Sequence, residues 1–168
     1  MKIIVWVLAL ILLLIAGGIG GCGKAPGEFA IYLTRNDIHP SEMTSLSHYE
    51  RADKPLISVK DVISYYKNTH EIKLTKEAFE RINSLKIPTY GKSFVLCVGE
   101  KQIYWGAFWA SYSSQSFDGV IILFPFLSEK ENTIQITLGY PSPSFFKGND
   151  PRSHPQIFQS FEKAGKLK

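Results

Sequence analysis

The amino-acid sequence predicts an α+β fold, a mostly antiparallel sheet with helices packed on one face. Four strand-like apolar runs follow one another in the second half of the chain. Sequential strands with short links favour antiparallel pairing. Segments with the apolar spacing of a helix lie on either side of these runs. The chain has only two cysteines, so a hydrophobic core rather than a disulfide framework has to hold the fold.

The first part of the domain alternates between strand-like and polar segments. Residues 29–34 have strand composition, and the polar stretch 35–55 reads as a loop. In the segment 56–66, Ser58 and Asp61 have the spacing of a capping box, which predicts a short helix behind them.

A strand followed directly by a helix is predicted next. Residues 70–75 alternate between polar and apolar side chains, which is typical of a strand. Thr75 has the place of an N-cap for a helix over 76–85. On the outer face of that helix, Glu77 and Arg81 have the spacing of an ion pair.

The second half holds the four strand-like runs and a final helix. The runs cover 93–99, 102–109, 119–126 and 133–140. A Pro-rich loop follows, and the segment after it has helical apolar spacing. Pro155 suits the first turn of this helix and Gly165 suits its C-terminal cap.

The N-terminus has the layout of a secretory signal. Lys2 is followed by an uncharged apolar stretch over 3–16 and then by small residues. The sequence Ile19-Gly20-Gly21-Cys22 resembles the lipobox of bacterial lipoproteins. That resemblance implies cleavage before Cys22 and a thiol that carries a lipid, with acyl chains such as palmitate inserted in the membrane. An uncleaved transmembrane anchor and a cleaved soluble protein are the alternatives.

The chain therefore divides into three parts. We expect a lipoprotein signal peptide at 1–21, a lipidated cysteine with a short tether at 22–28, and a single α+β domain at 29–168. The expected location is extracytoplasmic, with the chain lipid-anchored to a bacterial membrane.

Composition gives no sign of a nucleic-acid partner, metal or cofactor. The net charge is +4, without a cluster of Lys and Arg. The four histidines lack metal-ligand spacing, and each is expected on the surface or in a loop. The second cysteine, Cys97, lies in an apolar run and is expected to be buried.

The aromatic run 102–109 supplies the first candidate binding residues. On a strand, Trp105 and Trp109 face one way while Tyr104 and Phe108 face the other. A helix would cover one face. The other face needs a further layer or a partner, so Trp105 and Trp109 are either packing residues or contacts for a partner.

Three charged residues complete the candidates. Asp118 precedes a glycine and is typical of a turn. Asp150 and Arg152 flank Pro151 in the Pro-rich loop. This loop is either a cap for the last helix, with Arg152 paired to Asp150, or a recognition loop.

The run from "HEIKLTKEAFERINSL" through "GKSFVLCVGEKQIYWGAF" to "SFDGVIIL" resembles the periplasmic head subdomain of the SecD/SecDF protein-export family. The likeness covers roughly 57–124, under half of the chain. It implies a non-enzymatic α+β module that touches polypeptide outside the membrane. The whole chain also looks like the small uncharacterised lipoproteins of bacteria.

Together these features predict a membrane-anchored lipoprotein that binds an envelope protein or an extended polypeptide without catalysis. An open edge of its sheet is one way to accept such a segment. The alternative is a small hydrolase acting on cell-envelope material, with Asp118, the serines at 113–116 and His154 converging in space.

Overall fold

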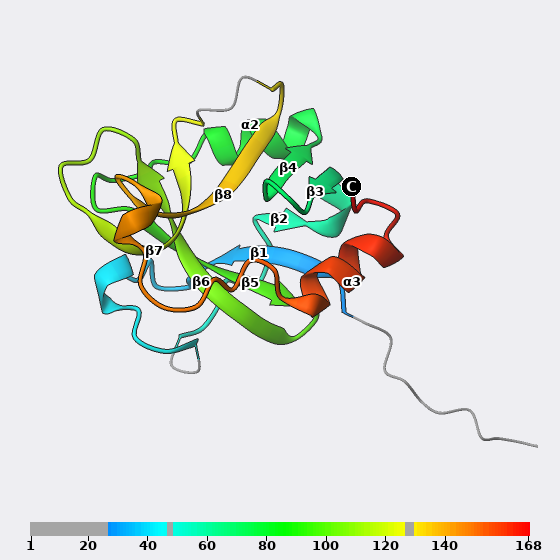
Figure 1. Cartoon of the computed structure of the whole chain (residues 1–168), viewed down its shortest axis with the longest axis horizontal. Helices are drawn as coiled ribbons and strands as arrows, with labels where there is room; N and C mark the ends of the chain where they lie inside the picture. The colour runs from blue at the N-terminus through cyan, green and yellow to red at the C-terminus, as the bar shows by residue number, and fades with distance from the viewer. Residues whose placement is uncertain (1–26, 47–48, 127–129) are drawn as a thin grey trace, which may run out of the picture.

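The computed structural model describes residues 27–46, 49–126 and 130–168 and shows an α+β domain with one curled eight-stranded sheet (Figure 1). The strand order is β2-β1-β5-β6-β7-β8-β4-β3. The strands are β1 (Phe29–Leu33), β2 (Ile57–Ser58), β3 (Val62–Tyr66), β4 (Glu71–Leu74), β5 (Lys92–Val98), β6 (Lys101–Ala110), β7 (Phe117–Phe124) and β8 (Thr133–Tyr140). The α-helices are α2 (Lys76–Asn83) and α3 (Pro155–Lys163), and the short 3-10 turns include η1 (Pro40–Glu42), η3 (Val59–Asp61) and η4 (Pro143–Phe145). The predicted signal peptide at 1–21 and Cys22 lie outside the described residues.

The sheet curls because its two edge strands are neighbours in sequence. The turn η3 alone connects β2 at one edge to β3 at the other. The last residues of the chain cover the outer edge of β3. The Tyr65 amide donates to the Lys166 carbonyl, and the Lys168 amide donates to the Tyr65 carbonyl, both at 2.8 Å. The Lys166 ammonium also donates to the carbonyl of Val59 at 2.7 Å, which fixes η3 to the C-terminal tail.

The sheet is mixed because β6 and β7 run parallel, whereas the other neighbouring strands pair antiparallel. The Ser-rich link between these two strands returns the chain to the starting end of β6. Gly106 then pairs with Val120. A Cβ atom at Gly106 would lie 2.5 Å from the Val120 carbonyl oxygen and 2.6 Å from the Phe94 ring, so this close approach requires glycine.

The prediction of a helix in 56–66 was wrong beyond its first turn. The Asp61 carboxylate does accept hydrogen bonds from Ser58, from its amide at 2.7 Å and its hydroxyl at 2.8 Å. Only η3 is helical, and the chain continues as β3. Val62, Ser64 and Tyr65 are buried while Ile63 and Tyr66 are exposed, and β-branched residues suit that half-buried strand.

The other two predicted helices, over 76–85 and after Pro155, are confirmed as α2 and α3. The Thr75 hydroxyl accepts the Ala78 amide at 3.3 Å, as an N-cap does. Pro155 stands in the first turn of α3, and Gly165 after it has a φ of +68°. The predicted pairing of Arg81 with Glu77 was wrong. The Arg81 guanidinium turns instead to Asp61, 3.0 Å away, because tertiary packing brings η3 beside α2.

One large core fills the inside of the curl. Every strand and both helices contribute buried side chains to it. Tyr65 stacks on Phe161 with ring centroids 4.4 Å apart, and Phe29 lies 4.5 Å from the same ring. Figure 1 places α2 and α3 well apart, at the upper and lower sides of the molecule. Two smaller apolar clusters lie outside this core, and in the one that includes residues of the polar loop after β1, Cys97 is fully buried, as predicted.

The C-terminal tail should stabilise the fold by covering the β3 edge. We predict that deleting residues 166–168 lowers the free energy of unfolding by about 2–4 kcal/mol, since several main-chain and ammonium hydrogen bonds are lost. Urea denaturation followed by tryptophan fluorescence measures the change. Lys163→Ala, which removes a lysine of α3 but leaves the tail, is the control and should unfold like the wild type. An unchanged midpoint after the deletion contradicts this role of the tail.

Candidate functional site

Strand β6 presents aromatic side chains to both faces of the sheet, as its alternation predicted. Tyr104 and Phe108 belong to the inner core, whereas Trp109 belongs to an apolar cluster on the outer face. Trp109 is only 2% exposed and stacks on Phe117 with ring centroids 4.8 Å apart. Side chains of the neighbouring strands, Phe117 and Tyr140, and the loop at Gly91 cover Trp109 on this face. Trp109, a candidate for partner contact, is therefore a packing residue.

Trp105 lies where the two outer clusters meet. It packs against the cluster that contains Trp109 and Phe117, and also against the cluster that contains Met43 and Cys97. Its side chain is half-buried and borders two concavities of the surface. Trp105 is thus the candidate of the aromatic run that a ligand can reach.

The two concavities are neighbours that share lining residues, and together we call them the Trp105 groove. Both are bordered by Trp105 and Lys147. The larger has a volume of about 470 Å³ and is lined also by Pro40, Ser41, Met43, Ser116, Phe117, Asp118 and Phe145. The smaller has a volume of about 370 Å³ and is lined also by Thr44, Ser45, Leu46, Ile103, Tyr104, Gly119, Val120, Phe146 and Pro151. The groove therefore combines residues of β6, β7, the polar loop after β1 and the Pro-rich segment.

The groove exists because β6 and β7 part at one end. Their pairing begins at Gly106 and Val120, so the first half of β6 has no partner in β7. The Pro-rich segment passes beside the opening and is held there by Asp118, which lies within β7 and not in the predicted turn. The Lys147 amide donates to the Asp118 carbonyl at 3.0 Å. The two side chains also form an ion pair, with 3.5 Å between Nζ and Oδ2.

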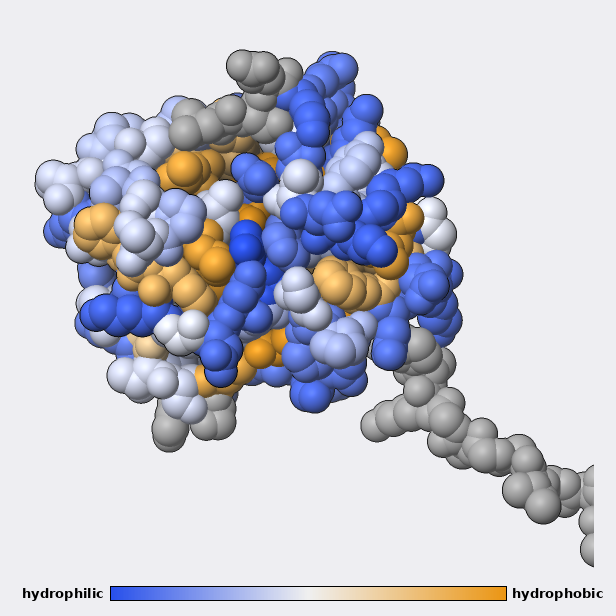
Figure 2. Space-filling model, in the orientation of Figure 1, coloured by the Kyte–Doolittle hydropathy of each residue, from blue (hydrophilic) through white to orange (hydrophobic). Residues whose placement is uncertain are grey.

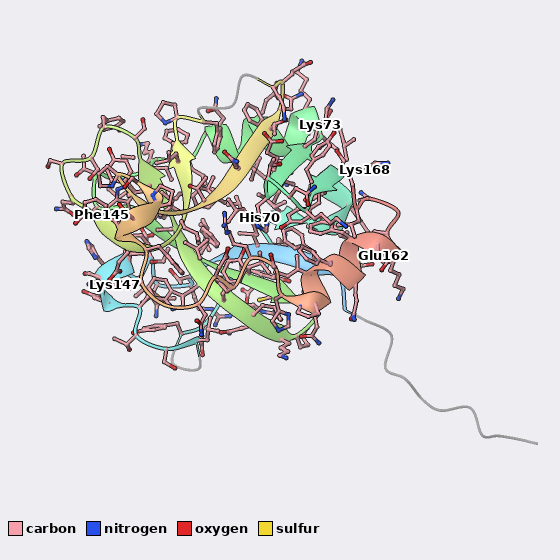
Figure 3. All side chains as sticks on the ribbon, in the orientation of Figure 1. His70, Lys73, Phe145, Lys147, Glu162 and Lys168 are labelled. Carbon is pink, nitrogen blue, oxygen red and sulfur yellow. The ribbon has the colours of Figure 1, made fainter. Side chains whose placement is uncertain are left out.

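The rim of the groove mixes exposed charge with apolar surface. The side chains of Asp118 and Lys147 are 54% and 82% exposed, so their ion pair is weak and both remain accessible to a ligand. Figure 3 shows Phe145 and Lys147 at the left end of the molecule, and Figure 2 shows apolar surface beside polar surface there. A mixed surface of this kind suits a segment of polypeptide better than a small ion.

Asp150 and Arg152 have a structural role at the edge of the core. The Arg152 guanidinium donates to both carboxylate oxygens of Asp150, at 2.9 and 2.8 Å, and to the Ile136 carbonyl at 3.0 Å. The hydrogen bonds from Arg152 hold the pKa of the Asp150 carboxyl below its ordinary value. Only 17% of the Arg152 side chain is exposed. The sequence left two roles open for this loop, a structural cap with Arg152 paired to Asp150 and a recognition loop. The geometry shows the pairing of the structural role.

His70 is a buried polar residue that sequence reasoning missed. It lies in a turn, as expected, but its ring is covered and its Nδ1 lies 2.7 Å from the Tyr65 hydroxyl. Burial lowers the pKa of the imidazole, and the nearby Arg152 charge lowers it further. The sequence did carry a signal for this burial. His70 alternates with Ile72 and Leu74, so all three side chains point to the same, buried face of the strand.

The groups proposed for a hydrolase do not form a catalytic constellation. The Ser113 hydroxyl accepts the Gln115 amide at 3.1 Å, and His154 Nδ1 accepts the Gln156 amide at 3.3 Å as the cap of α3. In the part of the chain that the structure describes, no hydrogen bond or ion pair joins these residues to Asp118. Over the same residues, no set of His, Cys, Asp and Glu is placed to hold a metal ion.

Comparisons with known proteins do not add a function. No protein-family model, no curated protein and no solved structure matches this chain. Among the described residues, no helix has the length and apolar character needed to cross a bilayer.

His70 should make stability depend on pH. The pKa of His70 is lower in the folded state than its ordinary value of about 6.5, so the unfolded state binds the proton first as pH falls. Stability should therefore be highest above about pH 6.5 and fall below it. We predict that His70→Asn flattens this slope, since asparagine tolerates the φ of +53° and does not titrate.

The measurement is urea denaturation between about pH 5 and 8, the range in which histidine titrates. His39→Asn is the matched control, because it makes the same substitution at the N-cap of η1, where asparagine can also cap the turn. An equal slope in His70→Asn and the wild type contradicts the assignment.

Proposed function

We propose that this chain is an extracytoplasmic lipoprotein, anchored to a bacterial membrane through Cys22, that binds an extended polypeptide of an envelope protein without catalysis. The lipobox-like sequence at 19–22 supports the anchor. The first strand begins at Phe29, so a tether of 22–28 would keep the domain close to the bilayer.

The Trp105 groove is the observation that carries the binding proposal. It joins two segments that the sequence put forward separately, the aromatic strand and the Pro-rich segment. Aromatic side chains in concave, partly desolvated places carry much of the binding energy in protein interfaces. Its apolar lining also includes Phe117 and Phe145, which suit a large apolar side chain of the ligand.

The arrangement of polar groups favours binding over catalysis. Asp118 faces Lys147, and neither is set against an activated nucleophile in the described part of the chain. The resemblance of 57–124 to the head subdomain of the SecD/SecDF family agrees with a module that touches polypeptide. That segment contains most of the strands that border the groove.

Substitution of Trp105 and of Trp109 distinguishes an effect on binding from an effect on folding. We predict that Trp105→Ala reduces capture of envelope proteins from solubilised membranes by about tenfold or more, because the ligand loses its aromatic anchor. Trp109→Ala should instead lower the free energy of unfolding by about 3–5 kcal/mol, because it empties a buried site. Quantitative mass spectrometry of the captured proteins and urea denaturation provide the two measurements.

The control for this pair is Tyr112→Ala. Tyr112 is an exposed aromatic residue outside the groove lining, so its loss should change neither capture nor stability. If folded Trp105→Ala captures the same proteins in the same amounts as the wild type, the groove is not the binding site.

The anchor is tested through the two cysteines. We predict that Cys22→Ala abolishes incorporation of an alkyne-labelled palmitate and leaves unprocessed precursor, because the acceptor thiol is gone. Cys97→Ala is the matched control and should remain labelled, since Cys97 is buried in the folded domain. Labelling and maturation of Cys22→Ala at the wild-type size contradict the lipoprotein assignment.

A further inference from the structure

We propose that the ligand of the Trp105 groove binds as an added β-strand, with its main chain paired to the first half of β6. This inference rests on the proposed function and names the form in which the polypeptide is recognised. It requires an edge of the sheet that is free to accept a strand and a space beside that edge.

The free edge lies along residues 101–105. These residues pair with β5 on one side, but the parallel pairing with β7 starts only at Gly106. Apart from β5, no described segment makes a main-chain hydrogen bond to Lys101–Trp105. Amide and carbonyl groups directed toward β7 in this stretch are therefore open to a ligand.

Other edges of the sheet are covered or short. The C-terminal tail pairs with β3, and β2 is only two residues long. The segment after residue 49 covers β1, where the amides of Arg35 and Ala52 take part in main-chain hydrogen bonds of 2.9 Å. The first half of β6 is thus longer than β2 and, unlike the outer edges of β1 and β3, has no described segment paired to it.

The space beside this edge has the size and lining for a strand. The 370 Å³ concavity is lined by Ile103, Tyr104 and Trp105 of this stretch and also by Val120 and residues of the Pro-rich segment. An extended segment of about four residues spans the stretch, at roughly 3.3 Å per residue. Alternate side chains of such a strand would point outward to the larger concavity, where Phe117 and Phe145 lie.

The chemistry predicts the class of ligand. Main-chain pairing provides affinity with little regard to sequence, and the apolar pocket selects one large side chain, aliphatic or aromatic. The ligand is therefore an extended polypeptide segment with an apolar residue near its middle.

The test uses main-chain chemistry of the ligand. The probe is a displayed library of random peptides about ten residues long, enough for a strand and its flanks. The library is selected on the full chain in detergent micelles, and binders that Trp105→Ala weakens are kept. The best of these is resynthesised with a single N-methyl group at each successive position.

Strand addition predicts an alternating result. N-methylation should weaken binding by about tenfold at every second residue, where the amide pairs with β6, and have little effect at the residues between. Peptide binding should also slow amide hydrogen exchange within 101–105. Lys73→Ala, a change on β4 away from the groove, should bind the peptide like the wild type and is the matched control.

The outcomes distinguish the two proposals. A Trp105-dependent peptide that is indifferent to N-methylation overturns strand addition and leaves the groove as the binding site. A library without any Trp105-dependent binder overturns both proposals.

Discussion

The short turn η3 is the constraint on which the rest of the structure depends. It connects the two edge strands of an eight-stranded sheet, so the sheet has to curl. Asp61 holds this turn. Its carboxylate accepts hydrogen bonds from Ser58 and pairs with Arg81, and its carbonyl accepts the Thr75 amide at 2.8 Å. Partial burial raises the pKa of the carboxyl, but these hydrogen bonds outweigh burial and keep the pKa below its ordinary value.

Curling of the sheet decides on which face the proposed binding site lies. The inside of the curl is filled with side chains from all strands and both helices, so the groove lies on the outer face. Residues of the polar loop after β1 cover the outer face of β5, whereas the outer cluster on β6 and β7 is made of side chains of the strands themselves. The groove lies where β6 and β7 part, with Trp105 at the junction of these two clusters. The same divergence that leaves Trp105 accessible also leaves the main chain of residues 101–105 without a partner on the β7 side.

Local sequence signals predicted much of the fold because their causes are local. Thr75 caps α2 through the Ala78 amide three residues away, and Pro155 begins α3. The alternation of β6 assigned Tyr104 and Trp105 to opposite faces. The stretch 56–66 was misread because its apolar pattern suits a helix or a strand, and pairing of β3 with β4 decided the outcome.

By itself the sequence predicted a location, and it determined the order of most elements and the face to which the aromatic residues of β6 point. It also put Trp105, Trp109, Asp118, Asp150 and Arg152 forward as candidates. Only the tertiary structure showed which of these candidates have a structural role and which line the groove. Trp109 is buried against Phe117 and Tyr140 of the neighbouring strands. Arg152 donates to Asp150 and Ile136, and Trp105, Asp118 and Lys147 all line the groove. The physical reason is that periodicity indicates the direction in which a side chain points. The residues that bury the side chain or bind it come from segments distant in sequence.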